Sequence, residues 1–179
     1  MSKDFIEKTL NKKLIYKGKF TELFCDEVQL PNGNSATREY INHHGAAAVL
    51  PFIDKENIVL VKQYRYAIGK VTYEIPAGKI DVGETPLECI TRELQEETGY
   101  IAKKFELLLS FYPTLALSNE LLHIFSAFDL EEGSLSPDED EFVDKEIVDF
   151  KTALDMVKSG HIKDSKTIIS LLYFASLSK

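Results

Sequence analysis

The stretch that decides the fold runs from residue 78 to residue 100. It reads Gly78-Lys-Ile-Asp-Val-Gly-Glu84, then seven further residues, then Arg92-Glu93-Leu-Gln-Glu96-Glu97-Thr-Gly99-Tyr100. Within it, Thr85-Pro86-Leu87-Glu88 is a capping box with proline at the first helical position. Gly99 suits the left-handed residue that ends a helix. These signals predict a helix over residues 85–98, after a loop, with Leu87, Ile90 and Leu94 as its buried stripe.

Three carboxylates share one face of this predicted helix. Glu93, Glu96 and Glu97 stand at i, i+3 and i+4. They lie in the last turn, where the helix dipole disfavours negative charge. A divalent cation such as Mg²⁺, which prefers oxygen ligands, would resolve this conflict, and Arg92 can orient a carboxylate. A glutamate pair alone more often marks a solvated surface, so the surrounding pattern carries the metal hypothesis.

Composition limits the class of protein. The chain has 179 residues, of which 44% are hydrophobic and 28% charged, and its net charge is −8. Such an acidic chain is not expected to bind nucleic acid. Its two cysteines, Cys25 and Cys89, lack the spacing of a disulfide framework or zinc cluster. The absence of an apolar run of signal or membrane-spanning length predicts a cytoplasmic protein with no membrane partner.

The remaining patterns predict strands on both sides of the helix and two helices at the end. Pro31-Asn-Gly-Asn34 has the turn chemistry of a hairpin, and residues 131–141 read as an acidic loop. This order indicates an α+β protein or a layered α/β/α sandwich. Strands are expected at 13–20, 23–30, 36–41, 45–53, 58–66, 72–75, 105–111, 121–128 and 146–150, and helices at 152–158 and 165–177.

The stretch from Gly78 to Tyr100 resembles the Nudix box. That box reads Gly, five residues, Glu, seven residues, Arg-Glu, an aliphatic residue, any residue, Glu-Glu, any residue, Gly and an aliphatic residue. All seven fixed identities are present in register, and Tyr100 in the last aliphatic place is a mild departure. The resemblance implies an α+β fold, a Nudix-type α/β/α sandwich with a mixed β-sheet, plus an N-terminal antiparallel β region.

The same resemblance implies the reaction and its metal site. Water attacks phosphorus of a diphosphate, assisted by Mg²⁺, for which Mn²⁺ can substitute. Glu93 and Glu97 are the principal metal ligands, Glu96 joins them, and Ala77 offers its backbone carbonyl. Arg92 orients the glutamates, and Glu84 braces the loop or serves the metal indirectly. The Ser, His and Cys residues form no apparent triad, which argues against a covalent mechanism.

Further segments resemble the ADP-ribose and nucleoside diphosphate sugar pyrophosphatase branch, whose products are a nucleoside monophosphate and a sugar phosphate. The branch implies a homodimer in which the N-terminal strands pack across the two copies and each site borrows residues from its partner. The implied division is a dimerising β region at 1–44 and a Nudix hydrolase domain at 45–179. The segments stand at 30–33, 37–40, 45–48, 59–65 and 74–78.

Carried over by position, Arg65 contacts the phosphates of a small nucleotide substrate. Arg38 does the same from the N-terminal region, or is a surface charge on a hairpin. Glu74 supports the site or is purely structural. In the acidic loop, Glu141, with Glu139 as second choice, accepts a proton from water or binds a further metal, unless that loop is only solvated.

Two further hypotheses stay open. Leu115 replaces a second proline that the ADP-ribose enzymes often carry after Pro113. The substrate is therefore either a nucleoside diphosphate sugar or another nucleotide, such as GDP-mannose, a dinucleoside polyphosphate or an oxidised nucleotide. A regulator that binds nucleotide without hydrolysis is the alternative from another class, although the complete set of box glutamates argues against it.

Overall fold

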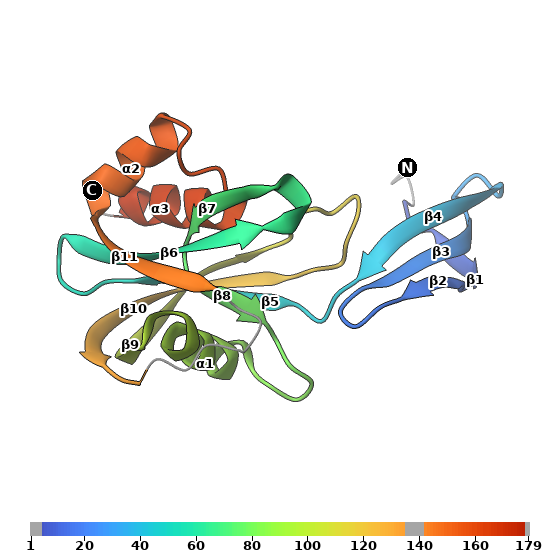
Figure 1. Ribbon diagram of the computed structural model, residues 1–179. Coiled ribbons are helices and arrows are strands. Elements are labelled where there is room, and N and C mark those ends of the chain that lie inside the picture. Colours follow the sequence, from blue (N-terminus) through green and yellow to red (C-terminus); the bar gives the residue numbers. More distant parts are fainter. Residues whose placement is uncertain (1–4, 135–141, 178–179) are drawn as a thin grey trace. The chain divides into compact units, whose positions relative to one another are not determined.

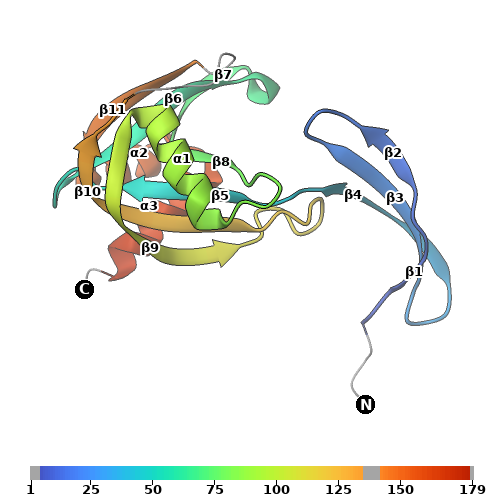
Figure 2. The ribbon, with the colours of Figure 1, turned by 90° about the horizontal axis from the view of Figure 1, so that it is seen from below.

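The computed structural model describes residues 5–134 and 142–177. The chain forms two compact units. The first comprises the described residues up to His44 together with Thr114–Glu120, and the second comprises Gly45–Pro113 and the described residues from Leu121 onward. Figures 1 and 2 show the strands of the first unit and the strands and helices of the second.

The first unit is a small antiparallel sheet centred on β3 (Glu22–Gln29). β4 (Ser35–Asn42) pairs along one side of β3, while β1 (Lys8–Asn11) and β2 (Leu14–Lys17) pair with its two ends. The predicted hairpin at Pro31–Asn34 is confirmed, because Gly33 has φ +89° and Asn32 accepts the N–H of Asn34 at 3.0 Å. β1 was not predicted, and its side chains are all exposed.

The second unit contains a mixed four-stranded sheet in the order β8 (Ala77–Lys79), β5 (Ala46–Pro51), β10 (Leu122–Glu132), β9 (Tyr100–Phe111). β5 and β10 are parallel, whereas the other neighbours are antiparallel. An antiparallel sheet adds β11 (Val143–Asp149), β6 (Asn57–Arg65) and β7 (Lys70–Glu74), and a 3₁₀ turn, η1 (Tyr66–Ile68), joins β6 to β7.

Helices cover both faces of these sheets, as Figure 1 shows. α1 (Pro86–Thr98) lies on one side, and α2 (Phe150–Lys158) and α3 (Ser165–Leu177) lie on the other. Successive residues of β5 point to opposite faces, so Ala47 and Val49 pack in the core that contains Ile90 and Leu94 of α1, while Ala46, Ala48 and Leu50 join the core of α3. The predicted α/β/α sandwich with a mixed sheet is confirmed.

Some local expectations were wrong. The acidic stretch from Glu131 begins inside β10, because Glu131 and Glu132 pair with the start of β9. Leu87 is exposed and Cys89 is buried instead, since the first turn of α1 carries its capping contacts at the surface. Within residues 5–134 and 142–177, every helix is too short or too polar to cross a membrane.

Candidate active site

Helix α1 begins and ends where its capping residues predict. Thr85 Oγ1 accepts the N–H of Glu88 at 3.2 Å, and Glu88 Oε2 accepts the N–H of Thr85 at 2.8 Å. Gly99 ends the helix with φ +72°. The N-cap at Thr85 and the C-cap at Gly99 set the length of α1 and therefore place the glutamates in its last two turns.

Strand β8 lies directly against the acidic face of α1. A Cβ atom built on Gly78 would lie 1.7 Å from Glu93 Oε1, so the carboxylate occupies the space that a side chain would need. One residue earlier, the Ala77 N–H donates to Glu97 Oε2 at 3.0 Å. Glu93 and Glu97 are only 8% and 4% exposed. The strand backbone thus holds two buried carboxylates beside each other.

Cys89 adds a further link between α1 and this strand. Its thiol donates to the carbonyl oxygen of Lys79 at 3.3 Å, and burial raises the pKa of this thiol to about 12. A thiol that stays protonated and buried is unreactive. Cys89 is therefore a packing residue of the candidate site.

Arg92 connects Glu84, in the loop before α1, with Glu93 and Glu96 of the helix. Its Nε and Nη2 donate to the two carboxylate oxygens of Glu84, both at 3.1 Å. Its Nη1 donates to Glu93 Oε1 at 2.7 Å and to Glu96 Oε2 at 2.8 Å. The hydrogen bonds to Glu84 are the main cause of the raised pKa of Arg92, and in turn lower the pKa of Glu84. A fixed cation thus offsets the like charges of the helix.

A second charged cluster surrounds Glu74 at the end of β7. Arg65 donates its Nε to Oε1 at 2.7 Å and its Nη2 to Oε2 at 2.6 Å. Thr72 Oγ1 donates to Oε1 at 2.6 Å, and Lys166 Nζ donates to Oε2. Glu74 is 2% exposed, and burial alone would raise its pKa; the cations and the threonine hold that pKa at about 2. Glu74 therefore stays ionised as the centre of this cluster.

The Glu74 cluster and the α1 glutamates belong to the same unit and influence each other. Glu97 contributes to the raised pKa of Arg65, after the larger effect of the hydrogen bonds that Arg65 donates to Glu74. Thr167 Oγ1 of α3 also accepts the N–H of Ile75 at 2.9 Å, two residues before Ala77. The segment between β7 and β8 is thus held from α3 on one side and from α1 on the other.

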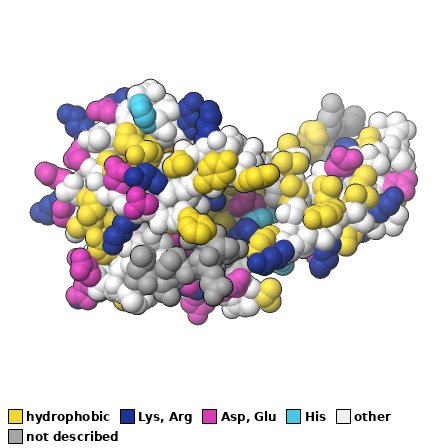
Figure 3. All heavy atoms as spheres, in the orientation of Figure 1, with side chains coloured by type: hydrophobic (Ala, Val, Ile, Leu, Met, Phe, Trp, Pro, Cys, Tyr) yellow, Lys and Arg dark blue, Asp and Glu magenta, His cyan; other side chains and the backbone are white. Residues whose placement is uncertain are grey.

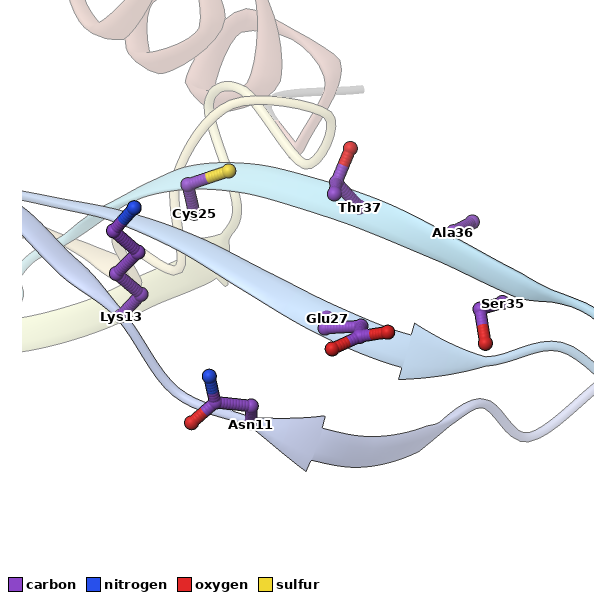
Figure 4. A pocket seen from close by; sticks show the side chains of 7 residues that line it. All are labelled: Asn11, Lys13, Cys25, Glu27, Ser35, Ala36 and Thr37. Atoms are coloured by element: carbon purple, nitrogen blue, oxygen red, sulfur yellow. The ribbon is translucent and has the colours of Figure 1, made fainter.

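The remaining predicted residues lie elsewhere. Arg38, on β4 of the first unit, forms a salt bridge with Glu7. Glu139 and Glu141 lie outside the described residues. The first unit also has an open pocket of about 380 Å³, shown in Figure 4, which the predicted site residues do not line. Its lining residues are Asn11, Lys13, Cys25, Glu27, Ser35, Ala36 and Thr37.

Comparison with known families explains this arrangement. The NUDIX domain family matches residues 42–171, and the nucleoside diphosphate sugar hydrolase N-terminal domain matches residues 7–41. The chain belongs to the Nudix family. Its two matches meet at the end of β4.

Relatives of this Nudix hydrolase cover most of its length. The ADP-ribose pyrophosphatase of Bacillus subtilis is 41% identical over 173 residues, which are 96% of this chain and 94% of the relative. The methanol dehydrogenase activator of Bacillus methanolicus is 41% identical over 175 residues, or 97% and 95%. The GDP-mannose pyrophosphatase of Salmonella typhimurium is 35% identical over 143 residues, or 75% and 74%.

A solved structure supports the fold of this Nudix hydrolase. The crystal structure of an ADP compounds hydrolase superposes with a TM-score of 0.88 and covers 98% of this chain and 96% of its own. The two sequences are 21% identical. The likeness therefore shows that the mixed sheet and its covering helices are shared.

The Nudix family typically uses divalent metals, and the donors beside β8 fit such an ion chemically. Glu93, Glu96 and Glu97 supply carboxylate oxygens, the ligands that Mg²⁺ prefers, and the bare backbone of Gly78 leaves room for the carboxylate of Glu93. Across residues 5–134 and 142–177, no three acidic, histidine or cysteine side chains are grouped as a metal cage. Instead Arg92 holds Glu93 and Glu96, and the Ala77 N–H holds Glu97.

Sequence reasoning missed two lysines of this Nudix hydrolase. Lys166 reaches Glu74 from a position 92 residues away. Lys145 of β11 donates to the carbonyl oxygen of Thr98 at 2.7 Å, at the end of α1, and its Nζ stands 4.2 Å from the centre of the Tyr100 ring. Neither lysine belongs to the box, and only the folded chain brings Lys145 to its last residues and Lys166 to Glu74. Tyr100, in the last position of the box, thus presents its ring face to the Lys145 ammonium.

Proposed function

We propose that this Nudix hydrolase cleaves the diphosphate bond of ADP-ribose or a related nucleoside diphosphate sugar, giving a nucleoside monophosphate and a sugar phosphate. The observation that carries the proposal is the packing of Glu93 and Glu97 onto the backbone of Ala77 and Gly78. The match of residues 7–41 to the sugar hydrolase N-terminal domain and the 41% identity to an ADP-ribose pyrophosphatase support the substrate class.

Mg²⁺, with Mn²⁺ able to substitute, would be held by Glu93, Glu96, Glu97 and the carbonyl of Ala77. When bound, the cation supplies charge that neutralises the diphosphate and activates water for attack. The chain itself supplies position: Arg92 orients Glu93 and Glu96. Its contacts fix these carboxylates before substrate arrives, which lowers the reorganisation that catalysis needs.

Arg65 is the residue we propose for contact with the substrate phosphates. Its Nε and Nη2 are directed at Glu74, and its side chain is 44% exposed. A planar guanidinium held on one edge can present its other edge to phosphate oxygens. For the proton acceptor, Glu141 is the first proposal and Glu139 the second. The role proposed for Arg38 is phosphate contact from the first unit.

We also propose that the chain works as a homodimer, with the β region at 1–44 as its dimerising part and residues 45–179 as the hydrolase domain. The first unit is a single-layer sheet with apolar side chains on both of its faces. Leu14 pairs with Phe24 and Tyr16 with Leu23, which are adjacent on β3 and point to opposite faces, and both Leu14 and Tyr16 are exposed. Figure 3 shows hydrophobic side chains on this unit. A sheet of this kind needs a covering partner.

Light scattering tests the dimer. Wild type is expected at about twice the 20.3 kDa chain mass. Leu14→Lys with Tyr16→Lys is expected to shift the mass toward that of one chain, because it puts a charge on each face of the sheet and a partner that covers either face would bury one. A wild-type mass of one chain at micromolar concentration would overturn the proposal.

The substrate proposal is tested by hydrolysis with Mg²⁺ and identification of the products. The panel holds ADP-ribose, GDP-mannose, UDP-glucose, a dinucleoside polyphosphate and a nucleoside triphosphate. Release of AMP and ribose 5-phosphate from ADP-ribose supports the proposal. Preferred cleavage of the dinucleoside polyphosphate or the triphosphate would replace the substrate class, and nucleotide binding without cleavage would favour the regulatory alternative.

A further inference from the structure

The carboxylate of Glu74 is gripped at both oxygens. Oε1 accepts from Arg65 Nε and Thr72 Oγ1, and Oε2 accepts from Arg65 Nη2 and Lys166 Nζ. Rotation of the carboxylate would break contacts at both oxygens. The orientation of the Arg65 guanidinium therefore depends on that of the Glu74 carboxylate.

Lys166 is itself held at the start of α3. Its Nζ lies 3.1 Å from Asp164 Oδ1, and Asp164 Oδ2 accepts from the N–H of Thr167 at 3.0 Å and from its Oγ1 at 2.6 Å. The Lys166 side chain is 13% exposed, compared with 44% for Arg65. Lys166 is thus the inner cation of the cluster, and Arg65 is the outer one.

The charges of the cluster balance as two cations, Arg65 and Lys166, against two anions, Glu74 and Asp164. Removal of the Lys166 charge would leave one excess negative charge beside the guanidinium. That excess would repel a diphosphate and would release one of the donors that hold Glu74. Arg65 would keep its partner but lose part of its orientation and of its attraction for phosphate.

We propose that Lys166 is a positioning residue for the diphosphate: by holding Oε2 of Glu74 from α3, it fixes the Arg65 guanidinium in the orientation that receives substrate phosphate. This inference rests on the proposed function. It gives a role in substrate binding to a residue of the C-terminal helix α3, outside the box. The action is indirect, because the contact from Lys166 goes to Glu74 and only Arg65 meets the substrate.

Steady-state kinetics on ADP-ribose separate this role from a general loss of structure. Lys166→Met is expected to raise KM about tenfold while kcat changes by less than about threefold, as for loss of a supporting partner of a ligand. Lys166→Arg, which keeps the charge, is expected to restore most of the KM. The matched control is Lys163→Met, which removes an exposed lysine three residues earlier and is expected to match wild type.

A double-mutant cycle with Arg65→Met gives the decisive readout. If Lys166 acts through Arg65, Lys166→Met is expected to change KM by less than about twofold once Arg65 is absent. Full additivity of the two substitutions would overturn the inference. If wild type does not cleave the nucleotide panel, the proposed function fails and this inference fails with it. If wild type is active but the effects of the two substitutions on KM are additive, only this inference fails.

Lys166→Met is expected to fold, because Glu74 keeps Arg65 and Thr72 as partners and Asp164 keeps Thr167. Circular dichroism checks this. If the variant does not fold, Lys166→Gln takes its place in the same cycle, since its shorter, neutral side chain loses the charged contact with Oε2 of Glu74. Non-additivity with Arg65→Met is again expected, and additivity would overturn the inference.

Discussion

The carboxylate of Glu93 lies in the space that a side chain at Gly78 would occupy. A Cβ there would lie 1.7 Å from Oε1 and 1.9 Å from Cδ of Glu93. Gly78 belongs to β8 and Glu93 to the buried side of α1. The first glycine of the box is therefore required by close approach of strand and helix, and the position of the carboxylate depends on it.

Gly78→Ala is expected to displace Glu93 and to lower kcat/KM about a hundredfold, because small misplacements of catalytic groups have effects of that size. Far-UV circular dichroism should remain that of a folded protein. The comparison is Gly33→Ala, at a hairpin tip where a Cβ would meet nothing within 4 Å although φ is +89°. Wild-type kinetics for Gly78→Ala would contradict the assignment of Glu93.

Arg92→Lys keeps the charge but removes the fork that serves Glu84, Glu93 and Glu96 together. We expect the Mg²⁺ concentration for half-maximal hydrolysis to rise about tenfold, as when an outer partner of metal ligands is lost. A Mg²⁺ titration of hydrolysis measures this. An unchanged midpoint would show that Arg92 does not prepare the metal site.

Glu74 is expected to make stability depend on acid pH. Its pKa falls from 4.5 to about 2 on folding, so its contribution is fully present above pH 4.5 and is lost as pH falls toward 2. The contribution is about 3 kcal/mol, from the size of that shift. Denaturant unfolding of wild type and Glu74→Gln at pH 6, 4 and 2.5 checks this: the difference between them should shrink with falling pH. A constant difference would contradict it.

Lys145→Met should destabilise the protein by about 1 kcal/mol, since it removes a cation from the C-terminus of α1 and from the face of Tyr100. Thermal unfolding should show a Tm lower by about 2–4 °C for a chain of this size. Lys55→Met, at an exposed turn, is the control and should leave Tm unchanged. Equal shifts in both variants would argue against a specific contact at α1.

Local signals in the sequence predicted much of the fold. The capping box, Pro86 and Gly99 located α1 to within a residue, because these residues satisfy backbone groups at helix ends. The Asn-Gly pair located the β3–β4 hairpin. The short strands β1 and β8 were missed, since three or four residues carry too little periodicity and their pairing depends on distant partners.

The residues of the candidate site likewise fall into those that local spacing predicted and those that only the folded chain brings together. Glu93, Glu96 and Glu97 follow from spacing on one helix, whereas the partners of Glu74 come from β6, β7 and α3. A contact between Glu74 and Lys166 spans 92 residues and leaves no local pattern. The alternation of β5 between two cores similarly needs the sheet order, which no single segment predicts.

We infer that the carboxylates of α1 serve metal-dependent cleavage of a nucleoside diphosphate sugar. The most direct test compares Mg²⁺-dependent hydrolysis of ADP-ribose by wild type, Glu97→Gln and Glu88→Gln, the last being a matched change in the cap of the same helix. We expect AMP and ribose 5-phosphate from wild type and Glu88→Gln, and a kcat at least about a hundredfold lower for Glu97→Gln. Wild-type kcat in a folded Glu97→Gln variant would contradict it.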